Sequence, residues 1–144
     1  MAFNENTRVK IPAILHLCRL GYDYLSLTNA KRDESTNIFI DLFSESIKRI
    51  NPDLEDIDLK RLLEDISLAL DNEDLGEVFY NMLTASSGIK LIDFNDFNNN
   101  SFHVVTELTY KNGEDEFRPD ITLLINGMLL HLSKLKSPIT MKEY

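Results

Sequence analysis

The chain has 144 residues, 43% of them hydrophobic, which suits one domain with a buried core and leaves little room for a second. Its formal net charge of −9 argues against simple non-specific binding to nucleic acid, because such binding depends on lysines and arginines that neutralise phosphates. No apolar run approaches the roughly 20 residues of a membrane helix, and residues 1–10 lack the apolar segment of a signal peptide, so we expect a cytoplasmic protein.

The first predicted helix covers about residues 8–20, with Pro12 near its start and Gly21 as its stop. Apolar side chains recur on one face of this helix at helical spacing and should pack on a sheet: Ile11, Ile14, Leu15 and Cys18. Because the chain has one cysteine, it can form neither an internal disulfide nor a cysteine-based zinc site, and we expect Cys18 to be a small buried side chain.

Three further helices follow a short strand or extended link at residues 22–27. The second should start near Ser35 or Thr36 and end at Asn51-Pro52; apolar spacing marks the third from 59 to 70. Asp74 and Glu77 offer a capping box for the fourth. Residues 41–80 hold twelve acidic against four basic side chains, which predicts a face turned toward solvent.

The pattern changes to strands after residue 88. Residues 102–110, "FHVVTELTY", are rich in β-branched and aromatic side chains, and residues 111–116 form a turn. Asn126-Gly127 between "DITLLI" and "MLLHLSKLK" is the strongest hairpin signal in the chain, because both turn positions require positive φ. Helices followed by a hairpin-rich sheet predict an α/β or α+β domain. We take α/β as the expected class, with a single domain over residues 1–144 in which the N-terminal helices pack on a mixed sheet that ends in a β-hairpin.

The hairpin also carries possible catalytic groups. A metal-dependent nuclease needs carboxylates that hold Mg²⁺ near the scissile phosphate, and a positive group that orients the attacking water. The stretch "FRPDITLLINGMLLHLSKLK", residues 117–136, resembles the PD-(D/E)xK nuclease superfamily, with Asp120 after a proline and Lys136 at the lysine position. Lys134 stands where the second acid of that pattern belongs.

The resemblance extends over most of the chain. "GIKLIDFNDFNNNSFHVVTELTY" followed by "FRPDITLLINGMLL" is similar to the N-terminal nuclease domain of type I restriction enzyme R subunits, and so is the opening "FNENTRVKIPAILHLCRLGYDYLSL". The resemblance implies a restriction-endonuclease-like fold, Mg²⁺ as cofactor, double-stranded DNA as substrate, and modification and specificity subunits as partners. It also implies an N-terminal piece of a longer subunit, without the motor that uses ATP; no GxxxxGK[ST] motif occurs here.

Carried over by this resemblance, Asp120 would be the metal ligand and Lys136 would polarise the water or stabilise charge in the transition state. Glu5 is a poor match to the acid that the family carries near its first helix. With Lys134 in place of an acid, the site lacks one oxygen ligand and gains a charge that repels a divalent ion. Its affinity for the metal should therefore be at least severely reduced. Glu107 on the preceding strand is the acid that could compensate.

Strand register adds a second obstacle. An ideal two-residue turn at Asn126-Gly127 puts Asp120 opposite Ser133, on a different face from Lys134 and Lys136. A bulge or a wider turn would restore a shared face.

Simpler roles exist for each of these residues. Asp120 could be a turn-entry aspartate after proline, and the lysines could protect an edge strand from aggregation. His16, His103 and His131 have no metal-ligand spacing and are expected to be packed or surface imidazoles. Three hypotheses follow: an endonuclease domain with a degenerate metal site, the same fold serving as a non-catalytic DNA-positioning or subunit-docking module, and an unrelated acidic interaction domain.

Overall fold

The computed structural model describes residues 9–71, 73–74, 76–85, 87–112 and 114–135. The described chain forms two compact units. Unit 1 comprises the described parts of residues 1–30, 102–124 and 129–144, and unit 2 comprises those of 31–101 and 125–128. Among the described residues, no helix has the length and apolar character required to cross a membrane.

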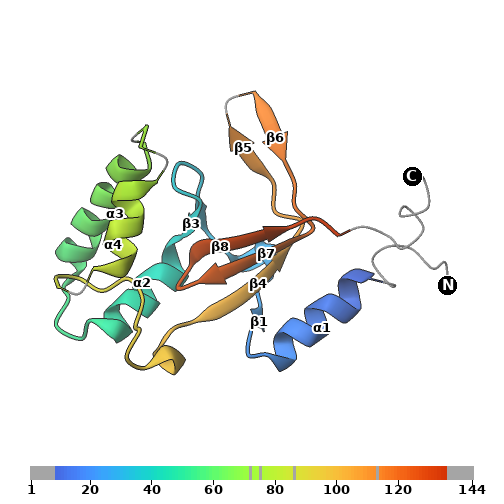
Figure 1. Cartoon of the computed structure of the whole chain (residues 1–144), viewed down its shortest axis with the longest axis horizontal. Coiled ribbons are helices and arrows are strands. Elements are labelled where there is room, and N and C mark those ends of the chain that lie inside the picture. The colour runs from blue at the N-terminus through green and yellow to red at the C-terminus, as the bar shows by residue number, and fades with distance from the viewer. Residues whose placement is uncertain (1–8, 72, 75, 86, 113, 136–144) are drawn as a thin grey trace. The chain divides into compact units, whose positions relative to one another are not determined.

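Unit 1 contains one α-helix, a short 3-10 helix, a main sheet and a small hairpin (Figure 1). Its elements are α1 (Ile11–Arg19), β1 (Asp23–Tyr24), η2 (Leu27–Asn29), β4 (Phe102–Thr106), β5 (Tyr110–Asn112), β6 (Asp115–Phe117), β7 (Ile121–Ile125) and β8 (Met128–Ser133), the tip 125–128 belonging to unit 2. Of the short strand or extended link predicted at 22–27, Asp23 and Tyr24 form β1 and Leu27 already belongs to η2; the predicted hairpin is confirmed in β7 and β8.

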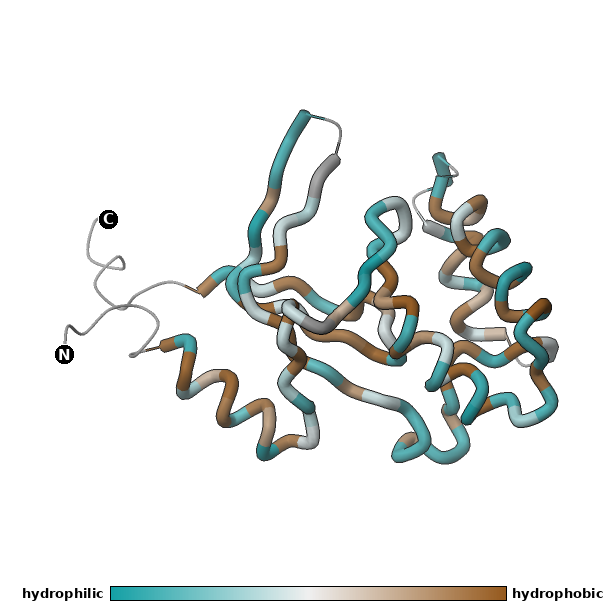
Figure 2. The backbone as a smooth tube through the Cα atoms, turned by 180° about the vertical axis from the view of Figure 1, so that it is seen from behind, coloured by the Kyte–Doolittle hydropathy of each residue, from teal (hydrophilic) through white to brown (hydrophobic). Residues whose placement is uncertain are grey.

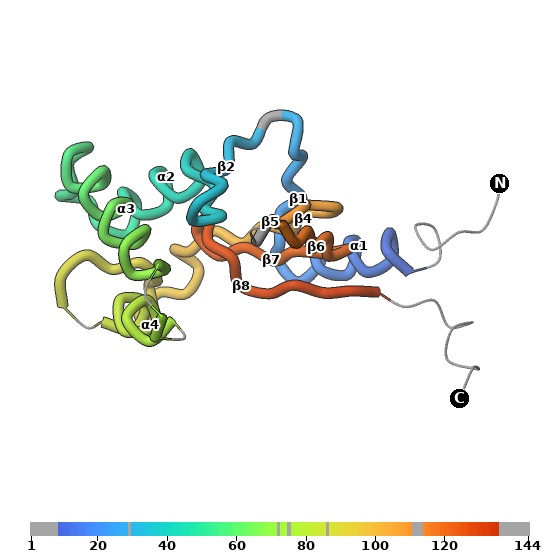
Figure 3. Tube along the Cα trace, turned by 90° about the horizontal axis from the view of Figure 1, so that it is seen from above, coloured from blue at the N-terminus to red at the C-terminus, as the bar shows by residue number. Residues whose placement is uncertain are grey.

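The main sheet has the strand order β1-β4-β7-β8, and Figure 3 shows these strands side by side. β1 runs parallel to β4, with Asp23 opposite His103. β4 and β7 are antiparallel, because the N–H of Asn126 donates to the carbonyl of Ser101 and the N–H of Glu107 to that of Asp120. The sheet is mixed, so the predicted α/β class is confirmed.

The turn between β7 and β8 has positive φ at both central residues, 51° at Asn126 and 78° at Gly127, as a type I′ turn requires. Asn126 is also fully buried: its amide donates to the carbonyl of Leu91 and to Asn100 Oδ1, and accepts from the N–H of Ser101. The backbone of Phe39 lies so close to Gly127 that a Cβ there would meet the Phe39 carbonyl at 2.7 Å. This turn therefore combines local hairpin chemistry with tertiary packing.

Unit 2 is largely helical and holds an apolar core. Its elements are β2 (Arg32–Asp33), β3 (Ile38–Phe39), α2 (Ile40–Ile50), α3 (Asp56–Leu70), α4 (Glu77–Thr84) and η3 (Phe97–Asn99). The core joins side chains from β3, α2, α3, the segment between α4 and η3, and the hairpin tip: Ile38, Phe43, Ile47, Leu59, Leu62, Ile66, Leu91 and Met128. Ten of the twelve acidic residues within 41–80 are exposed, which confirms the predicted solvent face.

The predicted start of the second helix near Ser35 or Thr36 is wrong, because α2 begins at Ile40. Residues 32–33 and 38–39 pair instead as an antiparallel hairpin. Asp33 stabilises this turn by accepting hydrogen bonds from the hydroxyls of Ser35 and Thr36. Serine and threonine side chains serve turns as readily as helix starts, which accounts for the error.

The predicted burial of the first helix is also wrong. None of the α1 side chains is buried, and Ile11 and Leu15 are 48% and 56% exposed. Cys18 is exposed as well. Figure 2 shows the apolar residues recurring along α1. Helical periodicity identifies the side chains that share a face, but it does not say whether another element covers that face.

Candidate functional site

Asp120 lies where β7 begins, opposite the end of β8. Its N–H donates to the carbonyl of Ser133 at 3.0 Å, so the two residues oppose each other as the two-residue turn predicts. Its side chain is 22% exposed, and Oδ2 accepts a hydrogen bond of 2.7 Å from the N–H of Leu135. One carboxylate oxygen is thus engaged by the backbone just beyond β8.

Lys134 approaches the other oxygen. Strand β8 ends at Ser133, and the Lys134 ammonium lies 4.0 Å from Asp120 Oδ1. The same ammonium donates to the carbonyl of Arg118 at 3.3 Å. The register of the strands predicts that Lys134 can approach Asp120 only with a bulge or a wider turn. In the structure the Lys134 side chain reaches Asp120 although the turn has two residues.

Glu107 follows directly after β4 and has the left-handed φ of 60°, which is uncommon for a residue with a Cβ. Its carboxylate is bound on both sides. Lys10 Nζ donates to Oε1 at 2.8 Å, and Arg118 Nη2 lies 3.1 Å from Oε2. The backbone N–H of Glu107 donates to the carbonyl of Asp120, so the two acids lie side by side at one end of the sheet, one just after β4 and the other just before β7.

The cations around Glu107 shift its protonation. The hydrogen bond from Lys10, together with the charges of Lys10 and Arg118, holds the pKa of the Glu107 carboxyl below its ordinary value. Lys10 is itself buried, with 9% of its side chain exposed, whereas the Arg118 side chain is 59% exposed. Lys10 is thus a fixed partner for Glu107, and Arg118 reaches it from solvent.

Sequence reasoning named only part of this cluster. Asp120, Lys134 and Glu107 were singled out and do lie together; Lys136 and Glu5 lie outside the described residues. Lys10 and Arg118 were missed. Arg118 immediately precedes the Pro119-Asp120 pair and could have been found from that proximity, but Lys10 lies 97 residues from Glu107 and no local pattern links them.

The cluster suits divalent metal poorly. Mg²⁺ takes oxygen ligands in a near-octahedral arrangement. Both oxygens of Glu107 face cations, and Asp120 is held by a backbone N–H and faced by an ammonium. Within the described ranges, no group of three histidine, cysteine, aspartate or glutamate side chains could hold a metal ion.

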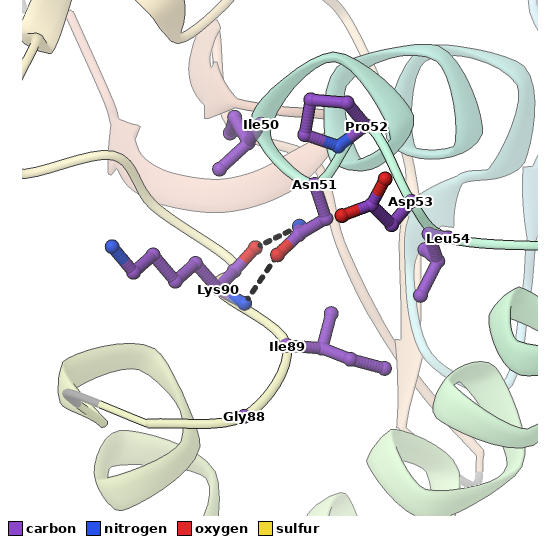
Figure 4. Close-up of a pocket in the computed structure, with 8 residues that line it drawn as sticks. All are labelled: Ile50, Asn51, Pro52, Asp53, Leu54, Gly88, Ile89 and Lys90. Atoms are coloured by element: carbon purple, nitrogen blue, oxygen red, sulfur yellow. Dashed lines mark hydrogen bonds between the residues drawn. The ribbon is translucent and has the colours of Figure 1, made fainter.

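Two surface pockets offer alternatives to this cluster. One of about 250 Å³ adjoins the cluster and is lined by Lys10, Ile11, Ile14, Thr106 and Glu107. Another of about 360 Å³ lies in unit 2 around Asn51 (Figure 4). The Asn51 amide there donates to the Lys90 carbonyl and accepts from the Lys90 N–H, so its polar groups serve the fold. The charged cluster at the end of the main sheet remains the stronger candidate.

Comparison with known proteins supports the resemblance noted above. A family model described as "type I restriction enzyme R protein N terminus" matches residues 2–143. A curated relative from Methanocaldococcus jannaschii, named "Putative type I restriction enzyme MjaIXP endonuclease subunit", is 32% identical over 161 aligned positions. That alignment covers 94% of this chain and 15% of the relative, so the chain corresponds to a small part of that protein. No solved structure matches the chain.

Proposed function

Because the chain belongs to the family of type I restriction enzyme R protein N-termini, we propose that it is the endonuclease-type domain of such an enzyme, with a degenerate metal site. The proposal includes a restriction-endonuclease-like fold, double-stranded DNA as substrate, modification and specificity subunits as partners, and a cytoplasmic location. In this proposal residues 1–144 act as one functional domain, and any ATP is used by a motor that is not part of these residues. The family match and the relative's name support this proposal.

The position of Lys134 carries the second half of the proposal. Its ammonium lies 4.0 Å from Asp120 Oδ1, the carboxylate oxygen to which the Leu135 N–H does not donate. An ammonium and a divalent cation repel each other, and lysine supplies no oxygen ligand. Glu107 does not replace the missing oxygen ligand, because Lys10 and Arg118 already bind its carboxylate. We expect no measurable Mg²⁺-dependent cleavage by this chain.

A non-catalytic role in the same complex is the second candidate. The same fold could position DNA or dock a neighbouring subunit, and the two neutralised carboxylates favour this reading for the chain by itself. Under either reading the isolated chain should bind duplex DNA weakly at about 0.15 M salt, because acidic residues outnumber basic ones.

The substitution Lys134→Glu tests the proposal. It changes the local charge by two units and supplies an oxygen ligand, so Mn²⁺ affinity measured by calorimetric titration should rise at least about tenfold, or about 1.4 kcal/mol. Lys60→Glu, on the exposed face of α3, is the matched control: it makes the same charge change far along the sequence from Asp120 and should leave Mn²⁺ affinity unchanged.

A plasmid-nicking assay with Mg²⁺ completes the test. The unmodified chain should not nick, and Asp120→Ala should reduce the metal affinity gained by Lys134→Glu. The degenerate-site proposal fails if Lys134→Glu and the unmodified chain bind Mn²⁺ equally, or if the unmodified chain nicks DNA and Asp120→Ala abolishes that activity.

A further inference from the structure

Positive charge exceeds negative charge within the cluster at the end of the main sheet. Three cations, Lys10, Arg118 and Lys134, surround the two carboxylates of Glu107 and Asp120. The buried ammonium of Lys10 binds Glu107 more closely than Arg118 does, at 2.8 Å against 3.1 Å. The remaining positive charge therefore lies on Arg118 and Lys134, whose side chains are 59% and 63% exposed.

These two side chains come from one corner of the fold. The Lys134 ammonium donates to the backbone carbonyl of Arg118, which ties the end of β8 to the residue before Pro119. An ammonium has three donors and a guanidinium five. In the described part of the chain, Lys134 directs its ammonium at one carbonyl and one carboxylate oxygen, and Arg118 makes its contact with Glu107 through Nη2. Each keeps donors for a further acceptor.

Resting on the proposed function, we propose that Arg118 and Lys134 form a metal-independent site for a phosphate group, occupied by a backbone phosphate of DNA. The Lys134 ammonium supplies beside Asp120 the positive charge that a divalent cation would supply in an intact nuclease site. Arg118 presents planar N–H donors, a geometry that suits phosphate oxygens. Asp120 then acts as a positioning residue for Lys134.

The distribution of charge along the chain favours this location. Residues 31–101 and 125–128 carry seven basic and sixteen acidic side chains, which repel a polyanion. Residues 1–30, 102–124 and 129–144 carry eight of each. A phosphate therefore meets less repulsion in unit 1, and the exposed cations at Arg118 and Lys134 give it a specific place to bind.

Titration of inorganic phosphate, followed by ¹H–¹⁵N NMR in EDTA, tests the site directly. Saturable shifts are expected for the Leu135 amide and for Arg118 Nε. The double variant Arg118→Gln/Lys134→Gln should weaken the apparent affinity at least fivefold, whereas Lys60→Gln/Lys90→Gln, which removes the same charge from unit 2, should leave it unchanged. Arg118→Lys keeps the charge without the planar fork and should retain part of the affinity. Circular dichroism verifies that each variant is folded.

Three results would overturn the site: no saturable shift at residues 118 and 135, shifts that appear only when Mg²⁺ is added, or equal losses in the two double variants. Shifts that need Mg²⁺ would indicate a metal-dependent contact. Equal losses in the two double variants would indicate a diffuse effect of charge.

Duplex DNA binding, measured over a series of salt concentrations from about 0.05 to 0.2 M, separates this inference from the proposed function. Loss of two phosphate contacts should make the negative slope of log affinity against log salt shallower by about 1.8. If the Arg118→Gln/Lys134→Gln variant binds DNA with an unchanged slope, DNA uses another surface, and the inference fails while the proposed function stands. If the unmodified chain binds phosphate at this site and no DNA, the phosphate site stands, but DNA as its occupant and the proposed DNA-handling function both fail.

Discussion

The two compact units of this chain differ in what their side chains do. Unit 2 encloses the apolar cluster around Phe43, Ile47 and Ile66, all fully buried, and carries the excess acid on its surface. Unit 1 contains α1, which buries none of its side chains, and an ion-pair cluster built around a left-handed residue, Glu107. Unit 1 also buries apolar strand residues, Val104, Val105 and Leu124 among them, so the contrast lies in its exposed helix and its charged cluster. Substitutions in that cluster should therefore affect chemistry more than stability, and substitutions in the core of unit 2 the reverse.

The largest effect is expected at the hairpin tip, which belongs to unit 2. Gly127→Ala should destabilise the protein by about 3–5 kcal/mol, because positive φ strains a residue with a Cβ and the new atom would meet the backbone of Phe39 and Phe43 at 2.7 Å. Urea denaturation measures the loss. Gly88→Ala is the matched control: φ is also positive, 82°, but no heavy atom lies within 4 Å of the added Cβ, so only the conformational cost of about 1–2 kcal/mol remains. Equal losses would show that Phe39 and Phe43 do not constrain the tip.

Truncation of apolar side chains compares the units directly. Ile66→Ala in α3 should cost about 3 kcal/mol, because it opens a cavity in the core of unit 2. Leu15→Ala in α1 removes a side chain that is 56% exposed and should cost less than about 0.5 kcal/mol. Thermal unfolding of both variants checks the difference. A large loss from Leu15→Ala would mean that α1 is covered in solution, and the contrast between the units would not hold.

The smallest effect is expected at the Glu107 ion pairs and depends on pH. The folded-state pKa of Glu107 is held below its ordinary value of 4.5 by Lys10 and Arg118. Its contribution to stability is therefore complete above about pH 4.5, and is lost as the pH falls through the lowered folded-state pKa. In the Lys10→Gln variant, the free energy of unfolding should therefore fall less on acidification. Urea denaturation at a series of pH values from about 3 to 7 measures this decrease.

A matched substitution sharpens that pH test. Arg118→Gln should alter the acid dependence less than Lys10→Gln does, because the Lys10 hydrogen bond is the main cause of the lowered pKa and the charge of Arg118 contributes less. An identical acid dependence in the Lys10→Gln variant and the unmodified chain would show that Lys10 does not control Glu107.

Local sequence patterns determined a substantial part of this protein. Asn126-Gly127 predicted the turn that the structure confirms, since the positive φ of both residues is a local preference. Apolar spacing located α3, and Asn51-Pro52 ended α2, because periodicity and proline geometry act over a few residues. The resemblance carried by "FRPDITLLINGMLL" identified the family that residues 2–143 match.

Tertiary structure alone decided which faces are covered and which charges meet. The stripe of α1 was visible in the sequence, but its exposure depends on whether any other element packs there. The pairing of Lys10 with Glu107 joins residues 97 positions apart, and no spacing rule reaches that far. Lys134 reaches Asp120 although strand alternation sets them on different faces, because β8 ends at Ser133 and the chain beyond it is no longer bound by the pleat of the sheet.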